Sequence, residues 1–448
     1  MLPIQNLRGS APVGREPTRV PTAPVSLILV LWALPMFAAV GGAQLSVDVG
    51  PIDIYAFKVL VPIAFFVTLL TVRSDLHVPT ETWASVGLTA WALIGALWAP
   101  EGAAAFKAAT VFAFAAMLFA MLRWWADRWR DQVVGALVTG WRVALLGTAL
   151  VAAWELATGS HLPTDLASNE ADVAGVVLSV FRNPNDYGAF LALAIPLCLF
   201  PAGRLRSFSV PIALGSAGLL VLSGSRFGLL AVGLAGVVAM VRFRHRWWTA
   251  PSTWVVVAGG TIGFVGLVAV GAKIAAKFTA LFLPGAFGNT SAGTRVALIG
   301  NGLWAAITTG GIGLGGGGYE VMTTAGDVPI HVRGGDVNPH NMWVEVVSEF
   351  GVVGLVLVLI LLGAIWGRLR RRGVPEPAAT VLWAALASYV VAVCTPSSYL
   401  ASPVNWMFLA TVSVLTLSGT IPGTSTRPLD ASSMLPVRRS APLGSADT

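Results

Sequence analysis

Long apolar runs alternate with polar loops along almost the whole chain. Each run has roughly the 20 residues that a helix needs to cross a bilayer. The runs lie near 26–43, 54–72, 82–98, 102–122, 136–157, 186–201, 208–223, 226–242, 253–271, 342–366, 377–395 and 404–420. This pattern predicts an all-α integral membrane protein with about 12 transmembrane helices.

Arginine is concentrated in every second loop and in the two tails. Nineteen of the 28 Lys and Arg residues fall there: Arg8, Arg15, Arg19, Arg73, Arg123, Arg128, Arg130, Arg204, Arg206, Arg242, Arg244, Arg246, Arg368, Arg370, Arg371, Arg372, Arg427, Arg438 and Arg439. Because cytoplasmic loops collect positive charge, the tails 1–25 and 421–448 are predicted to be disordered and cytoplasmic, flanking a membrane domain at 26–420. Alternatively, the first 43 residues imitate a signal peptide with a cleavage site before Gln44.

Two loops on the opposite, extracytoplasmic side are long. They run near 158–185 and near 272–341, the second between the ninth and tenth predicted helices. The second loop contains helix-like pieces, including Thr294–Thr308, so we expect it to be partly ordered. Loops of this length in a compact structure are usually functional or disordered.

Composition excludes a soluble protein. The chain has 448 residues, of which 56% are hydrophobic and 11% charged, whereas soluble domains carry about 25% charged residues. The net charge of +7 is spread over short loops, so it indicates membrane topology and attraction to anionic lipids, and no nucleic acid partner. No Cys and His spacing matches a zinc site, and neither a metal nor a cofactor is predicted.

Several basic residues oppose the charge rule. Arg182, Arg226, Arg295, Arg333 and His340 lie in the outer loops or at their edges. Charge that topology does not explain, at the boundary of a membrane span, indicates function by default. These residues therefore mark a predicted active site on the extracytoplasmic side of a membrane.

Two of these arginines are placed to bind an anion. Arg226 lies in the tight turn SGSRFG, at the head of the eighth helix, where free N–H groups and the helix dipole already favour negative charge. Arg295 begins a helical stretch in GTRVALIGNGLW. A guanidinium is a bidentate donor suited to phosphate. Without such a ligand, Arg226 would snorkel to lipid phosphates and Arg295 would be a solvated surface residue.

The segment NPHNMWVEVVSEFGVVG re-enters the membrane as the tenth span. His340 stands at the re-entry point and can remove a proton from a hydroxyl near neutral pH. Asn341 is a predicted N-cap, and Glu345 and Glu349 follow at one and two turns on a similar helix face. Carboxylates at membrane depth are costly unless they are paired or line a wet cavity. An interfacial histidine with its hydrogen bonds satisfied is the competing interpretation for His340.

The segment FRNPNDYG opens the sixth span with another polar cluster. Asn183, Asn185 and Asp186 offer helix capping and sugar-type hydrogen bonds beside Arg182. Lys58 lies near the outer end of the second span, where substrate binding and snorkelling explain it equally well. The run GGIGLGGGGYE lacks the Lys-Ser/Thr pair of a nucleotide-binding loop, so we interpret it as a flexible or close-packed turn.

Four motifs in this order resemble the O-antigen ligase and O-antigen polymerase superfamily: FRNPNDYGAFLALAIP, SGSRFGLLAVGLAG, GTR…W…GLGGGGYE and PHNMWVEVVSEFGVVG. The resemblance covers roughly residues 180–365. It implies a glycosyltransferase of the C class, independent of metals and cofactors, which moves a glycan from a polyprenyl-pyrophosphate carrier, such as undecaprenyl pyrophosphate, to an acceptor on the outer face. It also implies pyrophosphate contacts by Arg226 and Arg295 and a catalytic base at His340, with a looser correspondence for Lys58.

Chemistry supports the same interpretation. Pyrophosphate is a stable leaving group, so the site needs fixed positive charge and a base, and attack opposite the leaving group inverts the anomeric centre. The acceptor stays open between a polysaccharide, a glycolipid and a protein, and so does the choice between ligase and polymerase. A transporter or flippase for lipid-linked glycans and a non-catalytic scaffold are the competing hypotheses. The absence of an internal repeat weakens the transport hypothesis.

Overall fold

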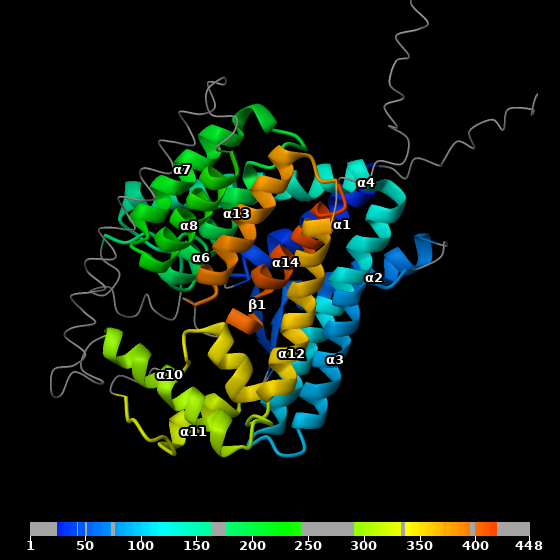
Figure 1. Ribbon diagram of the computed structural model, residues 1–448. Helices are drawn as coiled ribbons and strands as arrows, with labels where there is room; N and C mark the ends of the chain where they lie inside the picture. Colours follow the sequence, from blue (N-terminus) through cyan, green and yellow to red (C-terminus); the bar gives the residue numbers. More distant parts are fainter. Residues whose placement is uncertain are drawn as a thin grey trace, which may run out of the picture.

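The computed structural model describes residues 25–42, 44–49, 52–72, 77–163, 175–243, 291–332, 337–371, 373–394 and 399–418. This part of the chain is helical apart from one short β-hairpin (Figure 1). Arg333, the predicted ninth span and nearly all of both predicted tails lie outside the described residues.

Helices lie where the apolar runs predict them. They are α1 (Val25–Val40), α2 (Ala56–Thr71), α3 (Thr80–Gly95), α4 (Gly102–Thr158), α6 (Pro184–Cys198), α7 (Ser209–Leu222), α8 (Arg226–Phe243), α10 (Ser291–Thr308), α11 (Gly318–Ala325), α12 (Met342–Arg371), α13 (Glu376–Ala392) and α14 (Pro403–Leu415), with 3₁₀ turns η1 (Arg206–Phe208) and η2 (Tyr399–Ala401). Among the described helices, α4 and α12 have the length and composition to cross a membrane, and shorter apolar helices accompany them. The fold is that expected of a helical membrane protein, and the number of crossings stays a prediction.

The fourth and fifth predicted spans form one element. Helix α4 continues through the segment that was expected to be an Arg-rich loop, and only Trp129, at φ −138° and ψ 49°, leaves helical geometry. The segment RWWADRWRDQ contains no Gly or Pro to stop a helix, and an Arg123–Asp127 ion pair at 2.9 Å supports it one turn apart. The prediction of a loop was therefore wrong, and the chain changes direction at a kink instead.

A β-hairpin follows α1, where the sequence predicted only an outer loop. Strands β1 (Ser46–Val49) and β2 (Ile52–Tyr55) pair antiparallel, with Val47 opposite Ile54. The hairpin leads directly into α2, and the amide of Ala56 donates to the carbonyl of Leu45 at 3.0 Å. This outer connection is therefore ordered by backbone pairing.

The core is built around α6 and α14. Every residue from Tyr187 to Cys198 in α6 and from Val404 to Leu415 in α14 is buried. A helix that is apolar on all sides is expected to be enclosed by others. The peripheral helices instead expose large apolar side chains, such as Leu70 at 76% and Phe106 at 61%, as a lipid-facing surface requires.

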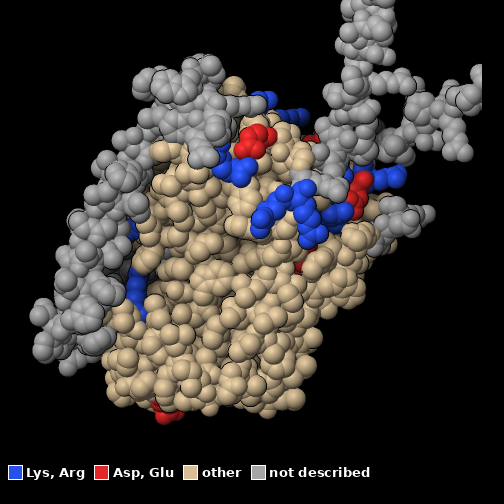
Figure 2. All heavy atoms as spheres, viewed as in Figure 1, with Lys and Arg blue, Asp and Glu red and all other residues tan. Residues whose placement is uncertain are grey.

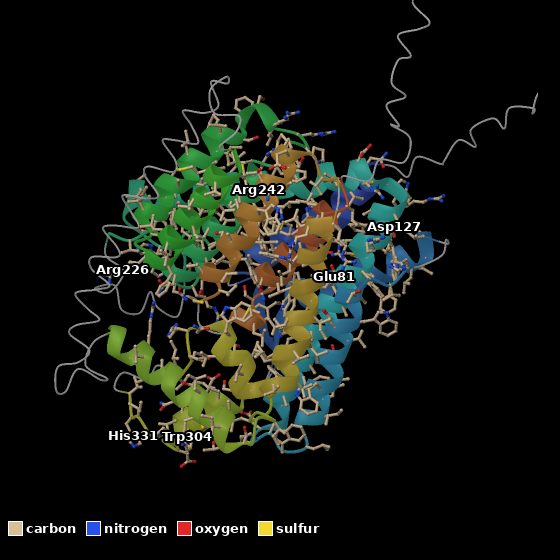
Figure 3. All side chains as sticks on the ribbon, in the orientation of Figure 1. Glu81, Asp127, Arg226, Arg242, Trp304 and His331 are labelled. Carbon is tan, nitrogen blue, oxygen red and sulfur yellow. The ribbon has the colours of Figure 1, made fainter. Side chains whose placement is uncertain are left out.

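Charge is distributed unevenly along the molecule. Most Lys and Arg atoms visible in Figure 2 lie toward the end that carries Arg242, while the opposite end, with Trp304 and His331, is almost bare (Figures 2 and 3). At the charged end Arg242 pairs with Glu376 at 3.0 Å, and Arg368 pairs with the buried Glu81. The helix ends that the sequence predicts to be extracytoplasmic, called the outer ends below, lie away from these arginine-rich loops.

Candidate active site at the outer helix ends

Arg226 is the first residue of α8. Ser225 caps the helix, because its Oγ accepts a hydrogen bond from the amide of Gly228 at 3.3 Å. Gly224 makes the turn with φ of 65°, a left-handed conformation that favours glycine. Arg226 is exposed beside this helix N-terminus (Figure 3), as the sequence predicted.

Arg295 lies in the first turns of α10 and contacts the neighbour of Arg226. Its guanidinium carbon is 5.7 Å from the centroid of the Phe227 ring, within the range of a cation–π interaction. This contact joins two motifs that are far apart in the sequence. It brings the start of α8 close to the first turns of α10 and places Arg295 beside the residue that follows Arg226.

His340 precedes α12 in an unusual backbone conformation. Its φ is 48°, in the left-handed region, and its side chain is half-buried. Asn341 caps α12, because its Oδ1 accepts hydrogen bonds from the amides of Trp343 at 3.0 Å and Val344 at 3.3 Å. The predicted cap is thus confirmed. Left-handed residues other than glycine are uncommon and cluster at functional sites.

The two glutamates of α12 anchor other segments of the outer region. Glu345 is buried, and its Oε2 accepts a hydrogen bond from the amide of Leu400, in η2, at 3.3 Å. The Glu349 carboxylate faces the backbone amides of Gly317 and Tyr319, at the N-terminus of α11, where a helix favours negative charge. Substrate binding by these two residues remains a prediction, since their described contacts are to the protein itself.

The glycine-rich run is a close-packed turn rather than a flexible one. The amides of Leu314 and Gly315 donate to carbonyls that α12 frees at its kink, those of Ser348 at 2.8 Å and Glu349 at 2.9 Å. A Cβ on Gly315 would stand 2.6 Å from the Cβ of Ala99. The run therefore joins α12 to the connection between α3 and α4.

A cavity of about 340 Å³ opens among the outer ends of α1, α2, α4, α6 and α14. Three basic side chains, Lys58, Lys107 and Arg182, line it together with Asp186. Five Phe and Trp residues contribute to its walls, together with small aliphatic residues: Phe57, Phe114, Phe181, Phe190 and Trp406. Two of the predicted substrate-binding residues, Lys58 and Arg182, thus meet in one cavity although their sequence positions are distant.

Local interactions hold these cavity residues in place. The Lys58 ammonium lies 4.8 Å from the Tyr55 ring centroid. Asn183 caps α6, since its Oδ1 accepts from the amide of Asp186 at 2.8 Å and its Nδ2 donates to Asp186 Oδ2 at 2.6 Å. Asp186 Oδ1 is buried and has no hydrogen-bond partner among the described residues. Asn185 is half-buried in the first turn of α6.

Lys107 and Asp186 were not selected as site residues from the sequence. Lys107 could have been identified from the sequence. It lies in the fourth predicted span near its predicted outer end, where the charge rule disfavours a lysine. Asp186 was noted only within its polar cluster. Its position in the cavity depends on the packing of α6 against α4 and α14.

A further anchor missed from the sequence fixes the outer loop before α6. Glu155, near the end of α4, is buried and accepts hydrogen bonds from the amides of Leu178 at 3.1 Å and Ser179 at 2.7 Å. Its other oxygen lies 2.9 Å from Nδ1 of His161. The carboxylate therefore positions the segment that leads to Arg182.

The predicted residues form separate groups. Arg226, Arg295 and His340 are not among the residues that line the cavity. Helix α6 connects the two regions, since a Cβ on Gly228 would stand 2.9 Å from the carbonyl oxygen of Gly188. The cavity and the turn that carries Arg226 therefore both adjoin the first turns of α6.

Comparison with known proteins gives one family match. Residues 211–359 match the family model described as O-antigen ligase. The matched segment contains Arg226, Arg295 and His340, and the cavity residues Lys58, Lys107 and Arg182 precede it. No curated protein matches the chain. The match supports the resemblance found in the sequence motifs: over residues 211–359 the chain is similar to the O-antigen ligase family, within the O-antigen ligase and polymerase superfamily.

Proposed function

We propose that the protein transfers a glycan from a polyprenyl-pyrophosphate carrier to an acceptor hydroxyl at the extracytoplasmic face of the bacterial inner membrane. About twelve membrane-crossing helices, with both termini in the cytoplasm, place the site outside. The reaction is inverting and needs no metal. The family match and the uneven distribution of Lys and Arg support this proposal.

The observation that supports the proposal is the contact between Arg295 and Phe227, the residue after Arg226, which brings the starts of α8 and α10 together. When the glycosidic bond to phosphate breaks, negative charge develops on the departing pyrophosphate. Two guanidinium groups and the free N–H groups of a helix start are suited to stabilise that charge.

His340 is proposed as the base. It accepts the proton of the acceptor hydroxyl as that oxygen bonds to the anomeric carbon, and the pyrophosphate leaves with the electron pair from the opposite side. General base catalysis contributes typically about 10²- to 10⁴-fold. The cap formed by Asn341 fixes the backbone beside the histidine.

Further residues are proposed to bind the substrates. Lys58, Arg182, Asn183 and Asn185 lie at the cavity or at the start of α6. For Asn341, Glu345 and Glu349, shaping of the site through their anchoring contacts is the physical role that their geometry supports.

The test is a glycan profile of cells that lack the gene, complemented with wild type, Arg226→Gln, Arg295→Gln or His340→Ala. Each variant is expected to accumulate lipid-linked glycan while reaching the membrane in normal amounts. Near-normal glycans in the two arginine variants would refute the pyrophosphate role. A stalled glycan of one repeat unit indicates a polymerase, and a long stalled chain indicates a ligase.

The transport hypothesis has its own readout with the purified protein. In vesicles, a transporter would move lipid-linked glycan between leaflets without forming a new glycosidic bond.

The matched control for the glycan profile is Arg123→Gln. It removes an equal charge at the opposite end of the molecule, where Arg123 pairs with Asp127, and is expected to leave the glycan profile unchanged.

A further inference from the structure

Helix α10 lies between the proposed pyrophosphate contacts and the proposed base, beside α11 and the outer part of α12 (Figure 1). Near its start, Arg295 contacts the ring of Phe227 in α8. Seven residues later, Gly302 packs against Val344, in the first turn of α12. Two helical turns, about 10 Å along the axis, separate Arg295 from Gly302. One helix thus reaches from the start of α8 to the start of the helix that follows His340.

Gly302 allows a close approach of α10 and α12. A Cβ at this position would overlap Cγ1 of Val344 and would stand 3.4 Å from Cε2 of Tyr319, in α11. Both neighbours are buried, and so is the glycine. A valine in a helix has one strongly preferred χ1 rotamer, so its Cγ1 cannot swing away at low cost. A side chain in place of Gly302 therefore forces the two helices apart.

Two further contacts hold α10 in this position. The hydroxyl of Tyr319 donates to the carbonyl of Leu298 at 2.7 Å. Asn301 is fully buried and bonds twice to Ile330, since its Nδ2 donates to the carbonyl at 2.8 Å and its Oδ1 accepts from the amide at 3.1 Å. Because packed interiors transmit strain, a displacement at Gly302 is passed along the whole helix.

We propose that Gly302 is a positioning residue: its contact with α12 sets the distance between Arg295 and His340. The inference rests on the proposed function, in which Arg295 contacts the pyrophosphate and His340 activates the acceptor hydroxyl. These two groups act on opposite sides of the anomeric carbon, so their separation must match the bond that forms and the bond that breaks. A misplacement of about 1 Å can lower the rate of such a reaction about 100-fold.

The substitution Gly302→Ala changes this distance by about that amount. The new methyl group needs a van der Waals separation of about 3.5–4.0 Å from Val344, so the two helices move apart by about 1 Å. Long arginine side chains adjust to such a shift, whereas a base must lie within about 2.6–3.2 Å of the hydroxyl oxygen. We expect kcat per folded protein to fall about 100-fold, and KM for the donor to change by less than about threefold.

The reciprocal variant is Val344→Ala. It removes the surface against which Gly302 rests and leaves α10 loosely placed, so kcat should fall by about 3- to 10-fold. In the double variant Gly302→Ala with Val344→Ala, the added methyl group fills the vacated space, and kcat should return to within about threefold of wild type. The comparison of Val344→Ala with the double variant does not need Gly302→Ala to fold by itself.

The matched control is Gly300→Ala, on the same helix. Its new Cβ would stand 3.4 Å from Cδ1 of Ile330, the far end of a flexible side chain. Because that side chain can give way without moving α12, Gly300→Ala is expected to keep the kcat of wild type.

The purified full-length protein is reconstituted into vesicles made from membranes of the gene-null cells, which supply both the accumulated lipid-linked glycan and its acceptor. Initial loss of lipid-linked glycan reports transfer, and glycan extracted from the same cells varies the donor concentration for KM. Thermal unfolding gives the folded fraction, to which each rate is normalised. A residue that only stabilises the fold would change the folded fraction and leave kcat per folded protein unchanged.

The outcomes separate the two proposals. Equal kcat of Gly302→Ala and Gly300→Ala overturns the positioning role, and so does a double variant that is no more active than Val344→Ala. Either result leaves the proposed function standing if His340→Ala is inactive in the same vesicles. Full transfer by His340→Ala overturns the proposed function instead, because the group that Gly302 is proposed to position would then not take part in the reaction.

Discussion

Arg142 provides the sharpest test of what holds the candidate site in place. Its side chain is fully buried in α4, at 0% exposure. Its guanidinium donates to four backbone carbonyls at and beyond the end of α6: Cys198 at 2.9 Å, Phe200 at 2.7 Å, Ala202 at 2.6 Å and Arg204 at 2.7 Å. The last carbonyls of a helix have no partner within the helix. Arg142 therefore stabilises the inner end of the helix whose outer end contributes to the cavity.

The substitution Arg142→Met preserves most of the side-chain volume and removes every donor. Hydrogen bonds to charged groups contribute about 1.5–3 kcal/mol each, and unsatisfied buried carbonyls cost a comparable amount. Water reaches the exposed connection after α6 and offsets part of this loss. We therefore expect a destabilisation of about 3–5 kcal/mol, the cost of breaking a buried charged network.

Thermal unfolding of the purified protein in detergent, followed by tryptophan fluorescence, measures this loss, with Arg142→Lys and Arg123→Met alongside. Lysine has three donors on one nitrogen and cannot reach four carbonyls in this arrangement, so Arg142→Lys should melt between wild type and Arg142→Met. Arg123→Met loses only a partly exposed ion pair and should melt like wild type. Equal melting of Arg142→Met and wild type would show that Arg142 does not stabilise the end of α6.

Three further predictions concern the outer region. Gly315→Ala should destabilise the protein by about 1–3 kcal/mol in the same melting assay, because φ is 84° and the new Cβ would collide with Ala99; an unchanged melting temperature contradicts the close packing of the turn. Asn341→Ala should cost about 1 kcal/mol through the lost cap and reduce glycan transfer, whereas Asn341→Ser, measured by the same glycan profile, should restore most of it. Glu155→Gln weakens the anchor of Ser179 and should increase limited proteolysis before α6; a digestion pattern equal to wild type would show that the anchor is dispensable.

Local pattern was enough to predict the helices and their caps. The apolar runs located α1 to α3, α6 to α8 and α12 to α14, because a run of bilayer length must satisfy its backbone hydrogen bonds within itself. Asn341 could be predicted as a cap because the amides that it accepts from lie only two and three residues away. The charge rule marked Arg182, Arg226, Arg295 and His340, because topology depends on which loops carry charge.

Other features of the fold depend on contacts between distant segments. The sequence predicted loops at the hairpin of β1 and β2 and at RWWADRWRDQ, where α4 continues through a kink at Trp129. From the sequence, the glycine-rich run could be either a flexible or a close-packed turn. Its contacts with Ala99 and with the carbonyls of α12 show that it is close-packed. The contact of Glu349 with the backbone amides at the start of α11 likewise depends on segments that are distant in the sequence.

The sequence by itself determined a series of apolar helices and identified the basic residues that depart from the predicted charge distribution of the loops. Those properties follow from hydrophobic length, local capping and charge placement, which act within a few residues. The packed structure was needed to show that Lys58, Lys107 and Arg182 share a cavity, that the start of α6 adjoins both this cavity and the turn of Arg226, and that Arg142 caps α6. These relations depend on which helices pack together, and that choice is made by side-chain fit between segments far apart in the chain.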